Sequence, residues 1–228
     1  MATDKKPKAI RYTTPKGTFV YPYLTKADYG NASFPDPAGT FKVNLRLTVE
    51  ESEPLLKALQ AIHDEAVRDG EQKFAALKVD VRKKLKSLTV TPLFVEEYDE
   101  KTEEPTGTVI FKFATKASGV NKKDDSVWNR TISLFDAAGK EIKPKMVGAG
   151  TVGKISYEAS PYFIPGTGVA GVKLYLVAAQ ILELSEGGAG GSASSYGFGQ
   201  EEGYEAEEDD ASFEADDSTA DSEADDKF

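Results

Sequence analysis

Alternation of apolar and polar side chains at a period of two restricts the fold of this chain more than any other feature. In residues 41–49 every second side chain is apolar, and the side chains between them are basic or polar. Successive side chains of a strand point to opposite faces, so the pattern predicts a strand with one buried and one solvated face. Residues 108–116 show a similar pattern, in which Val109, Phe111 and Phe113 alternate with Lys112 and Lys116. Further strands are predicted over residues 10–14, 18–24, 127–135, 152–160 and 172–184, separated by turns at residues 15–17, 35–39, 138–140 and 165–168.

A helical insertion, residues 52–88, interrupts the strands. Ser52 to Pro54 supply a helix start, and apolar residues then recur at helical spacing as far as Val67. After Gly70 the spacing continues to Leu88 with basic residues interleaved, which predicts a second, basic helix. These basic residues fit a solvated helix face and a nucleic-acid contact about equally well.

The order of these segments favours a mostly β fold. Strands, a helical insertion in the middle of the sheet and then more strands fit a five-stranded OB-fold barrel that the helix caps. A β-sandwich stays open as an alternative, because alternation alone cannot show whether a sheet closes on itself.

Charge divides the chain at residue 185. Residues 185–228 hold fifteen acidic residues and one basic residue, for a net charge of −14, whereas the whole chain carries −10. Residues 1–184 therefore carry 27 basic and 23 acidic residues, or +4. We predict one OB-fold domain over residues 1–184, followed by a glycine-rich linker and a disordered acidic tail over residues 185–228. A tethered polyanion can enter a positive groove of its own domain and compete there with a polyanionic ligand.

The end of the tail resembles a docking peptide. Asp225 and Asp226 precede Phe228, so an apolar ring lies beside a free carboxylate, and a partner's pocket can bind that combination. The rings of the tail favour docking, since a segment that only keeps a protein in solution needs none. A purely solubilising tail is the alternative.

The chain contains few residues that could carry catalysis. It has no cysteine, and its single histidine, His63, lies among the apolar positions of the first predicted helix, where we expect it to pack or to cap. Neither a catalytic triad nor a metal-spaced cluster can be built from one histidine. The carboxylates of residues 96–104 could hold a cation, but the lysine and proline among them favour a solvated loop. We therefore predict no enzyme, no cofactor and no metal.

A glycine-rich segment resembles a phosphate-binding loop. Residues 148–154 have the glycine and lysine spacing of a P-loop, but Ile155 stands where the Mg²⁺-binding Ser or Thr belongs, and the chain continues as a predicted strand. We expect a flexible turn that carries Lys154 to the edge of a groove. A P-loop-like enzyme is the alternative, which ATP turnover would reveal.

The start of the chain lacks the apolar core of a signal peptide, and no apolar run is long enough to cross a bilayer. The absence of cysteine is compatible with a reducing compartment. We expect a soluble, intracellular protein without a membrane partner.

Aromatic and basic residues are interleaved along the predicted strands and loops. Binding single-stranded nucleic acid without sequence preference requires rings that stack on bases and cations that follow the phosphates. Phe41, Phe111 and Phe113 share a face with aliphatic residues and are expected in the core. Trp128 and Ile132 are an even number of residues apart in the predicted strand and therefore share a face, so a core position for Trp128 stays open. The predicted DNA contacts are Arg11, Tyr12, Lys42, Arg46, Lys112, Lys116, Trp128, Arg130, Lys154, Tyr157, Tyr162 and Phe163.

An ordered series of short motifs resembles one known family. The series consists of residues 22–31 (PYLTKADYGN), 39–45 (GTFKVNL), 108–113 (TVIFKF) and 136–140 (DAAGK), the glycines 148 and 150, and residues 172–174 and 182–184. An acidic tail that ends in Phe228 completes it. Together these motifs resemble the replication single-stranded DNA-binding protein of the short-tailed, T-odd bacteriophages.

The resemblance implies an OB fold that coats single-stranded DNA during phage replication and recombination, assists annealing and dimerises, in the cytoplasm of the host bacterium. It also implies that the tail competes with DNA for the groove and contacts the DNA polymerase and the helicase-primase, with Phe228 as the docking residue. By position, the resemblance makes five residues the stronger candidates for DNA contacts: Arg46, Lys112, Lys154, Tyr157 and Tyr162.

Two other functions stay open. The chain could be an interaction protein, such as an acidic chaperone or a DNA mimic, whose tail binds basic partners directly. It could also bind RNA, because OB folds do so and nothing in the sequence reads a 2′-hydroxyl.

Overall fold

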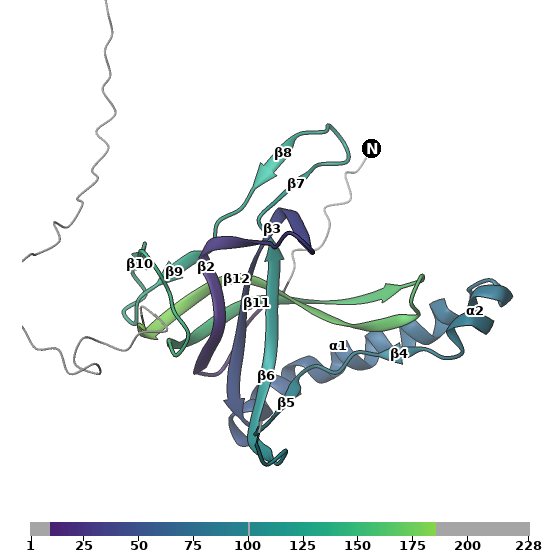
Figure 1. Ribbon diagram of the computed structural model, residues 1–228, viewed down its shortest axis with the longest axis horizontal. Helices are drawn as coiled ribbons and strands as arrows, with labels where there is room; N and C mark the ends of the chain where they lie inside the picture. Colours follow the sequence, from purple (N-terminus) through teal and green to yellow (C-terminus); the bar gives the residue numbers. More distant parts are fainter. Residues whose placement is uncertain (1–9, 100, 186–228) are drawn as a thin grey trace, which may run out of the picture. The chain divides into compact units, whose positions relative to one another are not determined.

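The computed structural model describes residues 10–99 and 101–185 of the chain. Strands and two helices make up this part (Figure 1). The elements are β1 (Arg11–Thr13), β2 (Gly17–Gly30), β3 (Pro35–Thr48), α1 (Val49–Ala75), α2 (Val79–Leu85), β4 (Thr89–Val90), β5 (Val95–Tyr98), β6 (Pro105–Lys116), β7 (Ser118–Val120), β8 (Val127–Asn129), β9 (Ser133–Phe135), β10 (Glu141–Ile142), β11 (Val152–Ile164) and β12 (Val169–Glu183).

Five long strands close into a barrel. They pair in the order β11, β2, β3, β6 and β12, and β12 pairs again with β11. Neighbours are antiparallel except β6 and β12, which are parallel where Phe113 lies opposite Leu174. This closure confirms the predicted five-stranded OB-like barrel and excludes the β-sandwich. The helical insertion lies between β3 and β6, as predicted.

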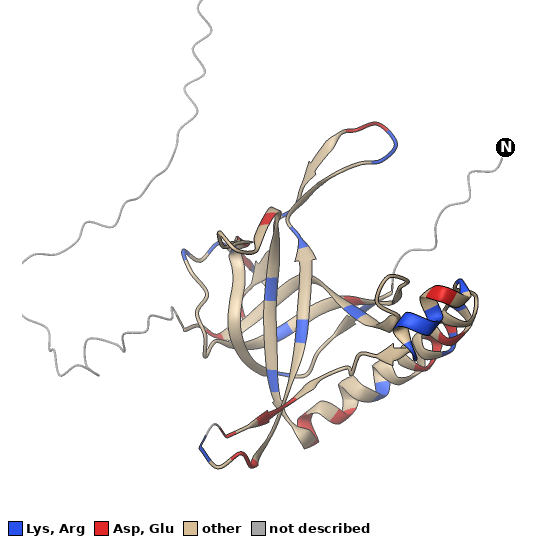
Figure 2. Cartoon of the chain, turned by 45° about the vertical axis from the view of Figure 1, so that its right-hand side comes forward, with Lys and Arg blue, Asp and Glu red and all other residues tan. Residues whose placement is uncertain are grey.

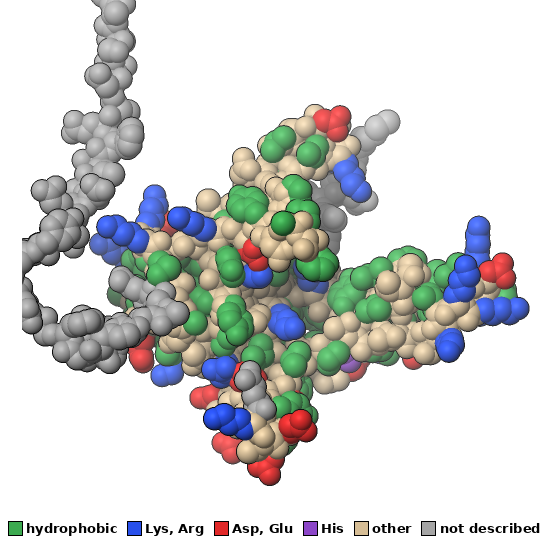
Figure 3. All heavy atoms as spheres, viewed as in Figure 1, with side chains coloured by type: hydrophobic (Ala, Val, Ile, Leu, Met, Phe, Trp, Pro, Cys, Tyr) green, Lys and Arg blue, Asp and Glu red, His purple; other side chains and the backbone are tan. Residues whose placement is uncertain are grey.

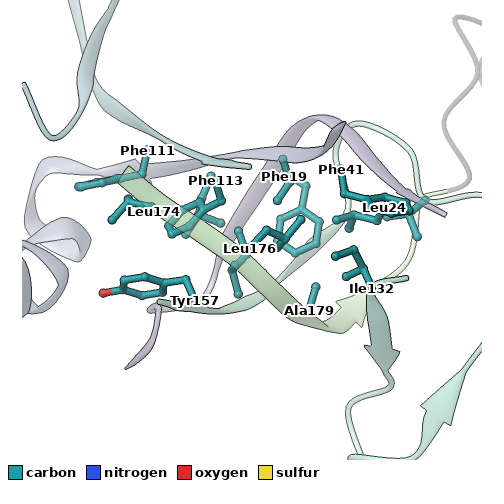
Figure 4. Packing of buried hydrophobic residues seen from close by; sticks show 14 of the residues in the cluster. Phe19, Leu24, Phe41, Phe111, Phe113, Ile132, Tyr157, Leu174, Leu176 and Ala179 are labelled. Atoms are coloured by element: carbon teal, nitrogen blue, oxygen red, sulfur yellow. The ribbon is translucent and has the colours of Figure 1, made fainter. Parts of the chain in front are cut away.

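The barrel interior is filled by the apolar halves of the alternating strands. Val43, Leu45 and Leu47 of β3 are buried, and so are Phe111 and Phe113 of β6 (Figure 4). Each large side chain that is fully buried in this way contributes about 1.5–3 kcal/mol to folding. The side chains that alternate with these buried ones lie on the outside of the barrel, where they are half-buried or exposed.

Helix α1 begins earlier than the sequence predicted. Thr48 is the N-cap: its hydroxyl accepts the N–H of Glu51, and the Glu51 carboxylate accepts the Thr48 N–H. This reciprocal capping box starts the helix at Val49, whose side chain is 55% exposed and not on the core face of β3. Leu55 and Leu59 then bury the apolar side of α1 in the barrel core.

Two of the predicted secondary-structure elements were wrong. Residues 35–39 are the first part of β3 and not a turn, because the β2–β3 hairpin extends until Gly30 pairs with Pro35. Residues 127–135 form two strands, because β8 pairs with β7 in a separate two-stranded sheet whereas β9 pairs with β12. The predicted boundary between domain and tail stays a prediction, since residues 186–228 lie outside the described residues.

Within the described residues, neither helix is long and apolar enough to span a membrane. 

Tyr157 of β11 lies in the core. Its side chain is fully buried, its ring stacks on Tyr12 with 5.5 Å between centroids, and it meets the Phe113 ring edge-on at 5.2 Å. The buried hydroxyl has no hydrogen-bond partner in the described structure. Burial raises the pKa of this phenol, so the group stays neutral.

Replacing Tyr157 by Phe tests this arrangement. We expect Tyr157→Phe to keep or raise the free energy of unfolding, by up to about 1–3 kcal/mol, because it removes a buried hydroxyl without a partner. The same change at Tyr162, whose hydroxyl donates to the Thr91 hydroxyl at 2.8 Å, should instead lower it by about 0.5–1.5 kcal/mol. Urea denaturation measures both. A clear loss of stability in Tyr157→Phe would contradict the described core.

Candidate functional site

A groove follows the outer face of β12 from Val172 to Gln180. It consists of three hollows of about 380, 570 and 580 Å³. The first two share Lys173, and the second and third share Arg11 and Val177, so the hollows adjoin. We call this feature the β12 groove. β6 and the base of the β7–β8 hairpin border it on one side, and β1 and β11 border it on the other.

The pleat of the strands explains which side chains reach the groove. On β11 the outward residues Lys154, Ser156 and Glu158 alternate with buried ones. On β12 a bulge leaves Val177 without a partner on β11, because Ser156 pairs with Ala178 and Tyr157 with Leu176. Val177 lies where the second and third hollows meet.

The β12 groove is strongly positive. Six cations and one carboxylate, Glu158, line it among the described residues. Four of the cations have no carboxylate within ion-pair distance in the described part of the chain. These four are Lys112, Arg130, Lys154 and Lys173, whereas Arg11 lies 3.4 Å from Glu158 and Lys116 lies 2.7 Å from Asp36.

Four rings lie between these cations. Tyr162 lines the first hollow, Trp128 and Tyr175 the second, and Phe135 the third. Trp128 and Tyr175 are 38% and 37% exposed, and each has a cation over its ring: Arg130 at 5.4 Å and Lys173 at 5.2 Å. The groove thus combines unpaired positive charge with accessible aromatic surface.

The outer face of β3 differs from the groove, because its cations are paired. Lys42 forms an ion pair with Asp28, and Arg46 donates two hydrogen bonds to Glu97 of 2.6 and 2.5 Å. The hydrogen bond from Arg46 holds the pKa of the Glu97 carboxyl below its usual value of 4.5. Lysines and arginines recur along the barrel strands (Figure 2), but those of β3 are already neutralised.

The carboxylates of residues 96–104 are not simply a solvated loop. Glu97 lies on β5, which pairs with β6, and it also accepts a hydrogen bond from Thr108 at 2.8 Å. Acidic side chains gather around the β5–β6 turn (Figure 3). Within the described residues no group of acidic, histidine or cysteine side chains could hold a metal ion.

The structure brings together seven of the predicted DNA contacts in the β12 groove. They are Arg11, Lys112, Lys116, Trp128, Arg130, Lys154 and Tyr162. Sequence reasoning missed Lys173, Tyr175 and Phe135, although Lys173 and Tyr175 alternate with buried Leu174 and Leu176 and could have been found by their parity.

The remaining predicted contacts lie elsewhere. Stacking of Tyr157 on a base is wrong for the folded chain, since the ring is fully buried. Tyr12 packs on Tyr157, and Phe163 is partly buried opposite Ala170, so neither lines the groove. Lys42 and Arg46 lie on the β3 face. Asp225, Asp226 and Phe228 lie outside the described residues.

The glycine-rich segment 148–154 does not form a phosphate cradle. The Gly148 N–H donates to the Ser185 carbonyl at 2.6 Å, and the Gly150 N–H donates to the Phe19 carbonyl at 3.0 Å. These amides are satisfied within the chain and cannot bind phosphate as a P-loop does. Lys154 lines the third hollow of the groove, but it does so from strand β11 and not from the expected flexible turn.

The chain is similar to single-stranded DNA-binding proteins of bacteriophages. The sequence model of the family described as single-stranded DNA-binding protein of bacteriophage T7 matches residues 17–184. The single-stranded DNA-binding protein of enterobacteria phage T3 is 30% identical over 203 residues, 86% of each chain. That of Escherichia phage T7 is 28% identical over 176 residues, covering 75% of this chain and 74% of the relative.

The chain belongs to the T7 single-stranded DNA-binding protein family. Its fold agrees with this membership: the crystal structure of the T7 protein, gp2.5, superposes with a TM-score of 0.57 at 29% identity, covering 77% of this chain and 92% of the T7 chain. The predicted resemblance is therefore confirmed. The β12 groove combines rings and unpaired cations, the two kinds of group that bind single-stranded nucleic acid without sequence preference.

The Arg46–Glu97 pair makes a pH-dependent contribution to stability. Because the pKa of Glu97 is lower in the folded than in the unfolded chain, the contribution is full above pH 4.5 and is lost as the pH falls through the folded pKa. We expect Glu97→Gln to have a lower free energy of unfolding than the unmodified chain at pH 7. At acid pH the difference between the two chains should disappear. Urea denaturation between pH 7 and pH 3 measures the difference.

Glu103→Gln is the matched control, because the exposed Glu103 makes no ion pair with another described residue. Its deficit should be small at every pH. Equal pH profiles for the two variants would show that Glu97 has no special role.

Proposed function

We propose that this chain binds single-stranded DNA in the β12 groove, without catalytic activity. The observation that carries the proposal is the grouping of four unpaired cations and four rings along one groove. Cations neutralise phosphates and release counterions, whereas rings stack on bases of any sequence. Membership of the T7 family supports DNA as the ligand.

The path of the single-stranded DNA follows from which cations are paired with carboxylates. OB folds commonly bind oligonucleotides across the second and third barrel strands, which are β3 and β6 here. Phosphates that approached β3 would have to displace Asp28 from Lys42 and Glu97 from Arg46. The bound DNA therefore runs from Lys112 on β6 along β12, where the cations have no carboxylate partner.

The acidic tail regulates this groove and recruits partners in the proposed function. Its net charge of −14 opposes the +4 of residues 1–184, so it competes with DNA for the same cations. Displaced by DNA, the tail offers Asp225, Asp226 and Phe228 to the phage DNA polymerase and helicase-primase. The protein acts as a homodimer in the host cytoplasm during replication and recombination, and it assists annealing. These roles rest on the family resemblance and on the charge division.

Removal of single groove cations tests the proposed path. Lys112→Ala and Lys173→Ala should each weaken binding to a fluorescent oligo-dT and reduce the slope of log K against log salt concentration by about 0.7, the value for one phosphate contact to a single strand. Fluorescence anisotropy at several salt concentrations measures both quantities.

Lys57→Ala is the control, because Lys57 is exposed on α1 and does not line the groove. If Lys57→Ala reduced the slope as much as Lys173→Ala, the β12 groove would not be the binding path. If the unmodified chain bound no oligo-dT at low salt, the proposed function itself would fail, and a tail-centred interaction protein would explain the chain better. Oligo-rU of the same length tests the RNA alternative.

Removal of the tail tests its competition with DNA. A truncated chain of residues 1–184 should bind oligo-dT more tightly than the full chain, because the intramolecular polyanion is gone. The difference should be largest at low salt and shrink as the salt screens both partners. Equal affinities at low salt would show that the tail does not enter the groove.

A further inference from the structure

The β7–β8 hairpin carries one wall of the β12 groove but belongs to neither the barrel nor its core. Its two strands form a separate sheet, with Ser118, Gly119 and Val120 opposite Asn129, Trp128 and Val127. It projects away from the barrel (Figure 1). Its base is anchored, because the Arg130 N–H donates to the Ala117 carbonyl at 2.7 Å and the Ser118 hydroxyl donates to the Ala38 carbonyl at 2.9 Å.

Trp128 and Gly119 are cross-strand partners in this hairpin. The indole lies directly on Gly119: a Cβ atom at residue 119 would come within 2.6 Å of Trp128 Cζ2, 2.8 Å of Cε2 and 3.1 Å of Nε1. Real Cβ contacts are longer than 3.0 Å, so any other residue at this position would push the ring away. An aromatic ring that covers a cross-strand glycine in this way is held by the backbone beneath it.

Arg130 contacts the same ring. Its guanidinium lies over the indole, 5.4 Å from the ring centroid, and it also donates a hydrogen bond to the buried Thr115 hydroxyl of β6. Thr115 thus connects the Trp128–Arg130 pair to the barrel wall. Trp128 and Arg130 both line the second hollow of the groove.

We propose that Gly119 is a positioning residue for single-strand binding: it lets the Trp128 indole lie on the β7 backbone, where Arg130 fixes it as a stacking surface beside the groove. The inference rests on the proposed function and adds a residue that touches no nucleotide itself. Val120 and Val127, on the opposite face of the hairpin, have no part in it.

A double-mutant cycle tests the inference. Trp128→Ala should lower the affinity for oligo-dT about 5- to 150-fold, the range for loss of one stacked base. Gly119→Ala should lower it in the same range, because the added methyl group displaces the ring. The double variant should bind like Trp128→Ala alone, since Gly119 acts only through the indole. Additive losses would overturn the proposal.

Two further readouts separate positioning from a general structural effect. Trp128 is the only tryptophan of the chain, so oligo-dT should quench its fluorescence in the unmodified protein and quench it less in Gly119→Ala. An abasic strand of the same length offers no base to stack, and Gly119→Ala should bind it as the unmodified chain does. An equal loss for the abasic strand and for oligo-dT would overturn the proposal.

The chain offers a matched control and a rescue. Gly166→Ala places a methyl group where nothing lies within 4 Å, and its affinity should not change. Combined with Trp128→Phe, whose smaller ring lacks Cζ2 and Nε1, Gly119→Ala should cost little relative to Trp128→Phe alone. If Gly119→Ala also lowers the stability of the fold, this comparison still separates the two causes. A loss of affinity that came from lower stability would appear in the Trp128→Phe background as well. If the unmodified chain binds oligo-dT but Gly119→Ala binds it equally well, the inference fails and the proposed function stands.

Discussion

Pairing between β11 and β12 is the interaction on which the rest of the structure depends. It closes the barrel, and closure divides the side chains of all five strands into an interior and an exterior set. Ile155 and Tyr157 go inside, so Lys154 and Glu158 must go outside. The same rule places Leu174 and Leu176 in the core and Lys173 and Tyr175 in solvent. The positive groove is therefore a consequence of packing: the strands that supply the apolar core also present the cations along β12.

Charge compensation then decides which part of the exterior can bind a polyanion. Both β3 and the groove carry lysine and arginine, but the β3 cations have carboxylates from β2 and β5 as partners, namely Asp28 and Glu97. An ion pair of this kind lowers the local potential and adds a desolvation cost to any ligand that breaks it. Along β12, four of the cations have no carboxylate within ion-pair distance among the described residues. Counting basic residues along the strands could not have separated these two faces.

The sequence specified much of the fold and less of the site. Period-two alternation located the barrel strands, because this pattern is local. The order of the strands and the helical insertion favoured an OB-fold barrel but left a β-sandwich open, because closure depends on pairing between strands that are distant in the sequence. The T-x-x-E capping box at Thr48 was also a local signal, and it would have moved the start of α1 to Val49. Parity could have excluded one predicted combination of DNA contacts, since Lys154 and Tyr157 cannot share a face of one regular strand. By contrast, Arg46 and Glu97 are 51 residues apart, and the packing of Trp128 on Gly119 depends on the register of a hairpin that alternation did not reveal.

The two kinds of groove residue respond to different conditions, which gives the hairpin a distinct part in binding. Phosphate neutralisation by Lys112, Lys154 and Lys173 weakens as salt rises, because fewer counterions are released. Stacking on an uncharged ring does not depend on counterion release and keeps its contribution at high salt. A rigid barrel fixes the cations through the registers of β6, β11 and β12. The indole, however, depends on the small β7–β8 sheet and on Arg130, which belongs to both sets: it is a cation of the groove and a support of the ring. Loss of Arg130 must therefore affect both the salt-dependent and the salt-independent part of binding, unlike loss of Lys112 or Lys154; Lys173, which lies over the Tyr175 ring, shares this double role.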